Sequence, residues 1–439
     1  MRITVRRPII WISLGLGCVL MLSIAISNAL LTNFMGLLSI GLLGHVAYKY
    51  RNHASLYIAL LFVVYSTYSI WVAIYLCPEL RPAFFNQFYD QSVYKEGMQC
   101  IYIFASFLWI FVHSGKYTKG NVFQKNNQIE SVDTANAIVS IGCAVIAIII
   151  ILTNFTYGGI EKRSEGTTIY EYKIILYIIG MLYSGHSKFL KSIWICMTVF
   201  ACALTFAGGN RADAIPLIIA VIFYYFNKLD YKVTTALVAV GVVLMVAVGS
   251  VRQEIVYGGI DLGHIINRIW KEKLTFDTAY WAYIPAIASI EVVKQTSYME
   301  RLRVLVGQFI YIVGGGRYSG YKLEFYVKQF YNHVNGFVSP VYFYFWFGIG
   351  GAVLFAGMVY GYLRAICKNQ KIHYEDKKKK INNMISAYFI AMVPRWYLYD
   401  PLSLMRGVMI MWICGTFAVY TEAFLFNRKQ RKKIQMETR

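Results

Sequence analysis

The sequence predicts an all-α protein that crosses a membrane about twelve times, because two features of the chain agree. Of its 439 residues, 58% are hydrophobic and only 15% are charged. Runs of about 20 apolar residues, the length a helix needs to cross about 30 Å of hydrocarbon, recur from one end of the chain to the other. We therefore expect a polytopic membrane protein built from helices.

The apolar runs give the order of the expected spans. The spans are 8–26, 29–48, 54–77, 99–113, 134–155, 174–187, 192–207, 212–226, 233–250, 338–363, 382–394 and 405–426. The first two and 174–187 are the least distinct, because their limits are blurred or the run is short. No small-residue cleavage site follows the first run, so we expect it to remain in the protein as a span.

The basic residues predict the orientation of these spans. Every second connecting segment is basic, as are both ends of the chain: 2–7, 49–51, 116–125, 188–191, 228–232, 364–380 and 428–439. Because short basic loops stay on the cytoplasmic side, we expect both termini in the cytoplasm. A basic rim beside anionic lipid also accounts for most of the net charge of +21, so nucleic acid is not an expected partner.

One outer segment, 251–337, is long and of mixed charge. It separates an N-terminal bundle of about nine spans, 1–250, from a C-terminal bundle of about three spans with a basic tail, 338–439. Its middle, 262–293, has a helical rhythm and many aromatic residues, which predicts an amphipathic helix lying on the outer membrane face. Loops of this length are functional or disordered, and dense aromatics argue against disorder. We expect a small outer cap.

A tight hairpin places an arginine near the outer surface. Between Lys191 and Lys228 lie about 36 residues, so each arm of the hairpin reaches about 26 Å, slightly less than the hydrocarbon thickness. Arg211 is therefore expected at or just below the outer headgroups, where a charge needs a partner. The next helix is expected to begin near Asp213, and an arginine beside a helix N-terminus can bind phosphate. The alternatives are a snorkelling arginine and Asp213 as a plain N-cap.

A histidine provides the second candidate for chemistry. Of the seven histidines, only His264 and His333 fall on the expected outer side. His333 lies between the cap and the next span, close to Asn332, Asn335 and Gly336. The near-neutral pKa of a histidine allows it to accept a proton from an attacking hydroxyl. Local hydrogen bonding in the loop is the alternative role.

Cysteines and cofactor motifs contribute few constraints. Most of the eight cysteines lie in expected spans, but Cys77 and Cys100 bracket the outer loop 78–98 and could pair in an oxidising compartment. No Cys or His cluster has metal-ligand spacing and no glycine-rich nucleotide loop occurs, so we expect neither a metal nor a cofactor. The internal repeats of inverted-repeat transporters are not evident.

These motifs resemble those of a known family. Residues 208–213, Gly-Gly-Asn-Arg-Ala-Asp, look like the outer arginine motif of bacterial O-antigen polymerases of the Wzy type. Residues 332–340, followed by the glycine-rich stretch 348–351, resemble the histidine motif that closes their large periplasmic loop, and 314–317 is similar to the loop arginine upstream of it. The order of spans and loops agrees along nearly the whole chain. The related O-antigen ligases share part of this pattern.

The resemblance implies a metal-independent GT-C-type glycosyltransferase of the bacterial inner membrane, with its active site facing the periplasm. It would polymerise oligosaccharide units carried on undecaprenyl pyrophosphate, which serve as donor and acceptor, beside a flippase and a chain-length regulator. Arg211 and Arg317 would stabilise the departing pyrophosphate, and His333 would orient or deprotonate the acceptor hydroxyl. Further substrate contacts are expected from Arg252, Asn335, Arg395 and Arg406. For Arg395 and Arg406, anchoring of span ends is an alternative.

Two other functions remain open. A ligase that transfers the finished polymer to lipid A core would share the arginine and histidine roles. A flippase or exporter of lipid-linked oligosaccharide is expected to carry charges in a cavity at mid-membrane, but the spans between 134 and 250 hold almost none. Aromatic rings of the outer loop could stack on sugars, although interface anchoring explains most tyrosines. The rings to test are Trp270, Tyr280 and Trp281.

Overall fold

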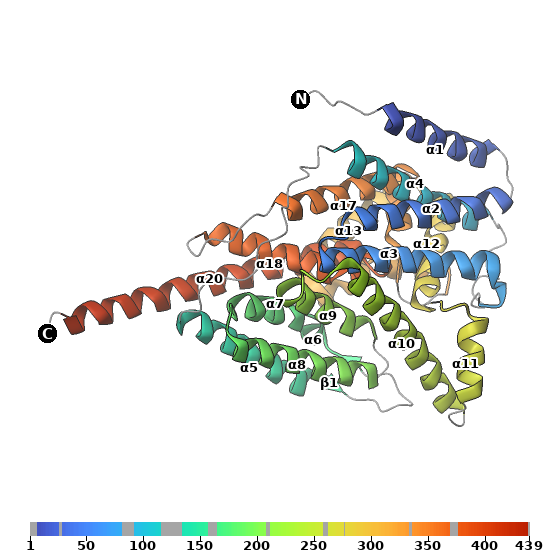
Figure 1. Cartoon of the computed structure of the whole chain (residues 1–439). Coiled ribbons are helices and arrows are strands. Elements are labelled where there is room, and N and C mark those ends of the chain that lie inside the picture. Colours follow the sequence, from blue (N-terminus) through green and yellow to red (C-terminus); the bar gives the residue numbers. More distant parts are fainter. Residues whose placement is uncertain are drawn as a thin grey trace.

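Nearly every described residue of this chain lies in a helix, because in lipid a helix satisfies its own backbone hydrogen bonds. The computed structural model describes residues 7–25, 29–80, 92–115, 134–156, 165–207, 211–257, 262–275, 277–332, 336–368 and 376–437. Within these residues, eight helices are long and apolar enough to cross a membrane. The long helices lie side by side in one bundle, shown in Figure 1.

The N-terminal helices form one side of the bundle. Their bounds are α1 Arg7–Ala25, α2 Ala29–Lys49, α3 Ala54–Trp71, η1 Val72–Leu76, η2 Pro78–Leu80 and α4 Ser92–Ser114. Helix α2 packs against both α3 and α4, and α1 lies at the edge of the bundle (Figure 1). At Gly36 of α2 the missing side chain leaves room for Trp71, whose indole Nε1 donates a hydrogen bond to Asn33 Oδ1 at 2.7 Å.

The middle of the chain forms a second group of helices. Its elements are α5 Thr134–Asn154, β1 Phe155–Thr156, β2 Glu165–Gly166, α6 Thr168–Glu171, α7 Lys173–Tyr183, α8 Lys188–Ala207, α9 Arg211–Tyr225 and α10 Tyr231–Tyr257. The two strands pair antiparallel, with Phe155 opposite Gly166. Helix α5 packs against α7, and the α8–α9 hairpin expected around Arg211 forms with its two helices in contact.

The segment expected to be a cap is only partly a surface structure. Its elements are α11 Leu262–Lys271, α12 Asp277–Gln295, α13 Tyr298–Gly314, η4 Gly315–Tyr321 and α14 Leu323–Lys328. Helix α11 is amphipathic, with Ile265 buried and Trp270 exposed. The expectation of one surface helix over 262–293 is wrong, because α12 is apolar on every side and packs inside the bundle against α3 and α4. Tyr280 is consequently buried.

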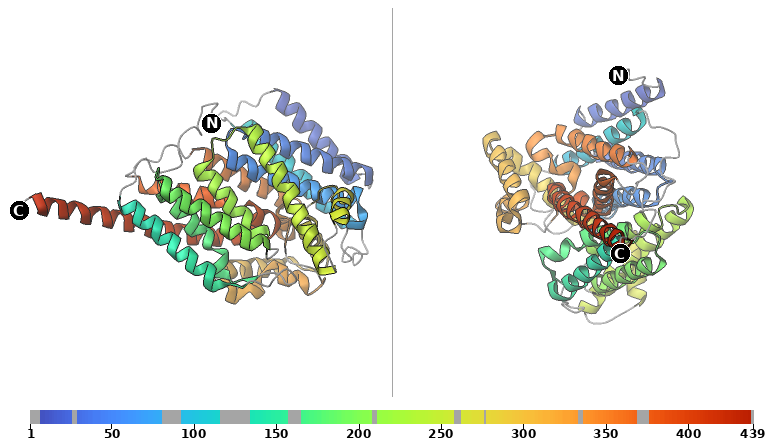
Figure 2. Two further views of the ribbon diagram at one scale, coloured as in Figure 1. Left: turned by 60° about the horizontal axis from the view of Figure 1, so that its bottom comes forward. Right: turned by 90° about the vertical axis from the view of Figure 1, so that its left-hand side faces the viewer.

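The C-terminal helices complete the bundle. They are α15 Ser339–Tyr342, α16 Tyr344–Phe347, α17 Gly350–Lys368, α18 Lys377–Ala391, α19 Val393–Leu398 and α20 Pro401–Glu437. Helix α20 projects well beyond the other helices in Figure 1 and in the left view of Figure 2. We call the end of the bundle where it projects the tail end, and the opposite end of α18 and α20, where α19 lies, the turn end. Near the tail end, the buried ammonium of Lys380 lies 2.7 Å from both carboxylate oxygens of Glu422.

The expected count of about twelve spans is not confirmed. The eight helices that meet the length and hydropathy requirements are α2, α3 with η1, α4, α5, α8, α10, α17 and α20. The apolar part of α1 is shorter, as are α7, α9 and α18, which have 11, 15 and 15 residues. In addition, the expected domain boundary after residue 250 falls inside the continuous helix α10. The disulfide suggested between Cys77 and Cys100 does not form in this structure, where both are free thiols.

The three short helices α7, α9 and α18 contact one another in the interior of the bundle. A helix of 15 residues is only about 22 Å long, less than the thickness of the hydrocarbon layer. Each of them is therefore shorter than a helix that crosses the whole layer. At the turn end, α6 adjoins the start of α7 and α19 adjoins the end of α18.

Candidate functional site

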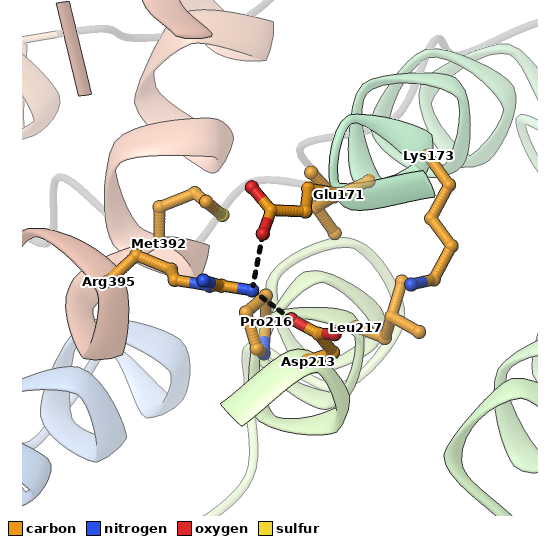
Figure 3. A pocket seen from close by; sticks show the side chains of 8 residues that line it. Glu171, Lys173, Asp213, Pro216, Leu217, Met392 and Arg395 are labelled. Atoms are coloured by element: carbon orange, nitrogen blue, oxygen red, sulfur yellow. Dashed lines mark hydrogen bonds and ion pairs between the residues drawn. The ribbon is translucent and has the colours of Figure 1, made fainter. Parts of the chain in front are cut away.

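Arg395 lies between two carboxylates at the turn end. It belongs to α19, a six-residue helix with a proline in its first turn. Its Nη2 atom forms an ion pair with Asp213 of α9 and lies 3.5 Å from a carboxylate oxygen of Glu171 in α6, as Figure 3 shows. Burial alone would lower the pKa of Arg395, but Asp213 and Glu171 raise it above its ordinary value. The guanidinium is thus a permanent positive charge.

Lys173 brings a second cation into the same pocket. The pocket is lined by Glu171, Lys173, Ile174, Asp213, Pro216, Leu217, Met392 and Arg395. Lys173 is only 2% exposed, and its ammonium lies 3.3 Å from the centroid of the Tyr170 ring. It lies one residue before the expected span 174–187. Burial lowers the pKa of Lys173 to about 8, although the nearby Asp213 opposes this shift.

Asp213 has a different place from the one expected. Helix α9 begins at Arg211, so Asp213 lies within the first turn and is not its N-cap. Its side chain is 6% exposed and forms the ion pair with Arg395. A buried carboxylate in the first turn of a helix is stabilised by the positive end of the helix dipole as well as by its cationic partner. Asp213 therefore connects the arginine hairpin to α19.

Arg406 contacts Tyr172, the residue that follows α6. It is in the second turn of α20, and its guanidinium carbon lies 5.5 Å from the centroid of the Tyr172 ring. Its guanidinium also occupies the place where a side chain on Gly315 would be. Gly315 has a φ of +74°, a conformation that favours glycine. The first residue of η4, the segment that contains Arg317, therefore lies directly against Arg406.

The end of the histidine motif is attached to α19. Gly336 has a φ of +128°, and a Cβ there would lie 2.9 Å from the carbonyl oxygen of Leu398. The backbone N–H of Phe337 donates to the same carbonyl at 3.0 Å. The hydroxyl of Ser339 donates to the carbonyl of Trp396. Three contacts thus bring residues 336–339 of the histidine motif against the helix that contains Arg395.

A fourth cation, Lys322, lies close to the turn between α19 and α20. Asp400 caps α20, since its Oδ1 accepts a hydrogen bond from the backbone N–H of Leu402 at 2.9 Å. The Lys322 ammonium lies 4.8 Å from the centroid of the Tyr311 ring. Burial alone would lower the pKa of Lys322, but Tyr311 and Asp400 raise it above its ordinary value. Lys322 is therefore another positive charge in the same region.

The expected site residues differ in how far the structure describes them. Arg395 and Arg406 are described fully; Arg395 contacts Glu171 of α6, and Arg406 contacts Tyr172, the residue after α6. Only the backbone is described for the three other arginines: Arg211 begins α9, Arg317 is in η4 and Arg252 is in α10. Helix α10, which contains Arg252, packs against α3 and α11. His333 and Asn335 lie outside the described residues.

Sequence analysis did not select the charged residues of α6 and its neighbours. Glu171, Lys173 and Lys322 all lie close to Arg395, Arg406 or Asp400 in the fold. One signal was available, because the pair Glu171 and Lys173 stands directly before an apolar run, at the same expected level as Arg211. The packing of α6, α9 and α19 decides which arginine each of these residues approaches. A local sequence pattern does not contain this information.

The chemistry open to this site is the binding of a negatively charged group by fixed cations. Guanidinium groups hold phosphate through paired N–H donors. Among the described residues, no three His, Cys, Asp or Glu side chains are grouped so that they could hold a metal ion. No family model, curated protein or solved structure matches this chain.

Proposed function

We propose that this protein is a membrane glycosyltransferase that polymerises oligosaccharide units carried on a lipid pyrophosphate. The observation that supports this best is the meeting of separate motifs at α19. The start of α9, the start of η4 and residues 336–339 of the histidine motif all contact α19 or the first turns of α20. These are the segments in which the resemblance to O-antigen polymerases lies.

The proposed reaction needs little more than positioned cations and a base. The growing chain leaves its lipid pyrophosphate while a hydroxyl of the next unit attacks the sugar carbon. Negative charge accumulates on the departing pyrophosphate, and preorganised arginines stabilise it at low cost. Arg395 of α19 and Arg406 of α20 would take this role. Arg211 and Arg317 belong to the adjoining segments α9 and η4. His333 would accept the proton of the hydroxyl.

The depth of the site supports a lipid-linked substrate. The helices α7, α9 and α18 are shorter than a full-length span, so in the proposed arrangement the charged residues at their ends would lie below the level that a full-length span reaches. A pyrophosphate attached to a lipid lies at the headgroup level, with its hydrocarbon beside the helices. In the proposed orientation the turn end faces the periplasm, and the basic residues of α18 and of the tail lie in the cytoplasm of a bacterial inner membrane.

The decisive experiment is polymerisation by the purified protein supplied with synthetic lipid-linked repeat units. We expect a ladder of products that lengthens by one unit per step, and its loss in Arg406→Ala and His333→Ala. Arg303→Ala is the matched control, since Arg303 is an exposed arginine on α13. Transfer of preformed polymer to lipid A core without a ladder would identify a ligase. Movement of the lipid-linked unit across vesicles without new glycosidic bonds would identify a flippase.

A further inference from the structure

The two carboxylates that hold Arg395 differ in their exposure. The Asp213 side chain is 6% exposed and lies in the first turn of α9, a 15-residue helix that packs against α3, α7, α8, α18 and α19. The Glu171 side chain is 48% exposed and lies 3.5 Å from Nη2 of Arg395. It is the last residue of α6, a four-residue helix capped by Thr167. Glu171 can therefore leave the arginine with little rearrangement, while Asp213 cannot.

The charges of the pocket explain what such a movement would do. With Glu171 in place, the pocket holds two carboxylates, Glu171 and Asp213, and two cations, Lys173 and Arg395, so it is neutral. When Glu171 turns toward the solvent, one carboxylate remains against two cations. The pocket then has a net positive charge and an open face on the guanidinium (Figure 3).

We propose that Glu171 occupies, in the free protein, the position that the diphosphate group of the substrate takes, and that Arg395 and Lys173 bind this group once Glu171 is displaced. This inference rests on the proposed function for the identity of its ligand. It adds two residues to the site, Glu171 as a competing carboxylate and Lys173 as a second cation.

The exchange is favourable for physical reasons. An exposed ion pair contributes little to stability, so replacing the contact between Glu171 and Arg395 costs little. A diphosphate carries more negative charge than a carboxylate and offers several acceptor oxygens to the paired donors of a guanidinium. Asp213 stays in place throughout and keeps Arg395 oriented. The competing carboxylate also disfavours smaller anions of single charge, which gain less from the same two cations.

The test measures binding of inorganic pyrophosphate to the full-length protein in lipid nanodiscs by titration calorimetry. We expect Glu171→Gln to bind pyrophosphate at least threefold more tightly than the wild type, with the difference shrinking at high salt. Glu291→Gln is the matched control, because it also removes one carboxylate from an ion pair, the one with Lys294 at 3.0 Å on α12. Its affinity should equal that of the wild type.

Two conservative variants define the cationic side of the pocket. Lys173→Gln and Arg395→Lys should each weaken pyrophosphate binding at least threefold, with thermal unfolding used to confirm that both proteins are folded. The proposal is overturned if Glu171→Gln binds no more tightly than the wild type, or if no variant alters the affinity. Because this assay contains no glycan, tighter binding without polymerisation would reject the proposed function alone. Polymerisation with unchanged binding in Glu171→Gln would reject this inference alone.

Discussion

At the scale of single residues, the contact between Arg395 and Asp213 is the more buried of the two ion pairs that Arg395 forms. The two residues are 182 positions apart and come from different helices, so their contact fixes α9 against α19. Removing one partner of a buried pair is costly, because the remaining charge loses its compensation while it stays out of water. Their pairing therefore serves the fold as well as the site.

Replacing Asp213 with Asn should destabilise the protein by about 3 kcal/mol, the lower end of the range for a broken buried pair, because Arg395 is 22% exposed. The measurement is thermal unfolding in detergent. Lys379→Met is the comparison, since it breaks the exposed pair with Asp376 at 3.0 Å and should cost about 1 kcal/mol or less. Equal effects of the two substitutions would contradict the buried character of the Arg395 pair.

Lys173 makes the pocket sensitive to pH. Burial lowers its pKa from 10.5 to about 8, so its positive charge is lost as the pH rises through 8. The charged and titratable groups around it are Asp213, Arg395, Cys202, Glu171 and Tyr170. Pyrophosphate affinity of the wild type, relative to that of Lys173→Gln, should fall between pH 7 and pH 10. Comparing the two proteins cancels the titration of the ligand itself.

Stability should change in the opposite direction over the same pH range. Between pH 8 and 10.5 the unfolded chain holds a proton on Lys173 that the folded chain has released. Stability therefore rises with pH in this window, and it rises more in the wild type than in Lys173→Gln. Parallel melting curves of the two proteins at pH 7 to 10 measure the difference. An identical pH dependence in both would show that Lys173 stays charged.

At the scale of elements, α19 is the part around which the site is built. It is a six-residue helix between α18 and the long helix α20, and it receives contacts from α9, α6 and Phe337 of the histidine motif. The segment η4 reaches the same region through Gly315, which permits both a positive φ and the approach of Arg406. The backbone conformation of Gly315 thus decides where η4, the segment that contains Arg317, begins.

Gly315→Ala should displace η4 or Arg406, because the added carbon overlaps the guanidinium and the φ of +74° is strained for alanine. We expect the yield of the polymer ladder to fall at least tenfold while the protein still inserts into the membrane. The matched control is Gly320→Ala in the same segment, where a Cβ meets nothing within 4 Å. The control should leave the ladder unchanged, and a similar loss in both variants would refute the role of this contact.

The sequence predicted some of these elements better than others. The hairpin α8–α9 was predicted because both arms are apolar and the turn is glycine-rich. The helical rhythm and aromatic residues of 262–293 predicted a surface helix, whereas α12 is mostly buried and packs against α3 and α4. Arg395 was predicted from the sequence as a substrate-binding cation. Its contacts with Asp213 and Glu171 could not be predicted, because they depend on packing between distant helices. Local patterns contain no information about such contacts.

At the scale of the whole molecule, the bundle combines long and short helices. Within the described residues, eight helices are long enough to cross a membrane, and the shorter helices α7, α9 and α18 form a group in the interior of the bundle. Three of the apolar runs counted as spans, 174–187, 212–226 and 382–394, correspond to these shorter helices. The ion pairs of Arg395 lie at the turn end, and the buried pair of Lys380 and Glu422 lies near the tail end.

A labelling experiment tests this arrangement in intact cells. In a background where all eight cysteines are replaced by Ser, Gly320→Cys and Asp230→Cys place single thiols near the turn end and near the opposite end of α9. A membrane-impermeant maleimide added from outside the inner membrane should label position 320 at least tenfold faster than position 230. Labelling of both positions at the same rate would contradict the orientation.

The contact between Gly315 and Arg406 has a consequence for how this protein can evolve. A larger residue at 315 needs the space that the guanidinium takes, so it is tolerated only when position 406 holds a shorter side chain. The two positions are thus coupled, although 315 alone looks like an ordinary loop glycine. In a collection of diverged relatives, we expect glycine at 315 wherever arginine stands at 406, and joint replacement elsewhere. The covariation of this pair would mark the boundary between sequences that keep this site and those that have rebuilt it.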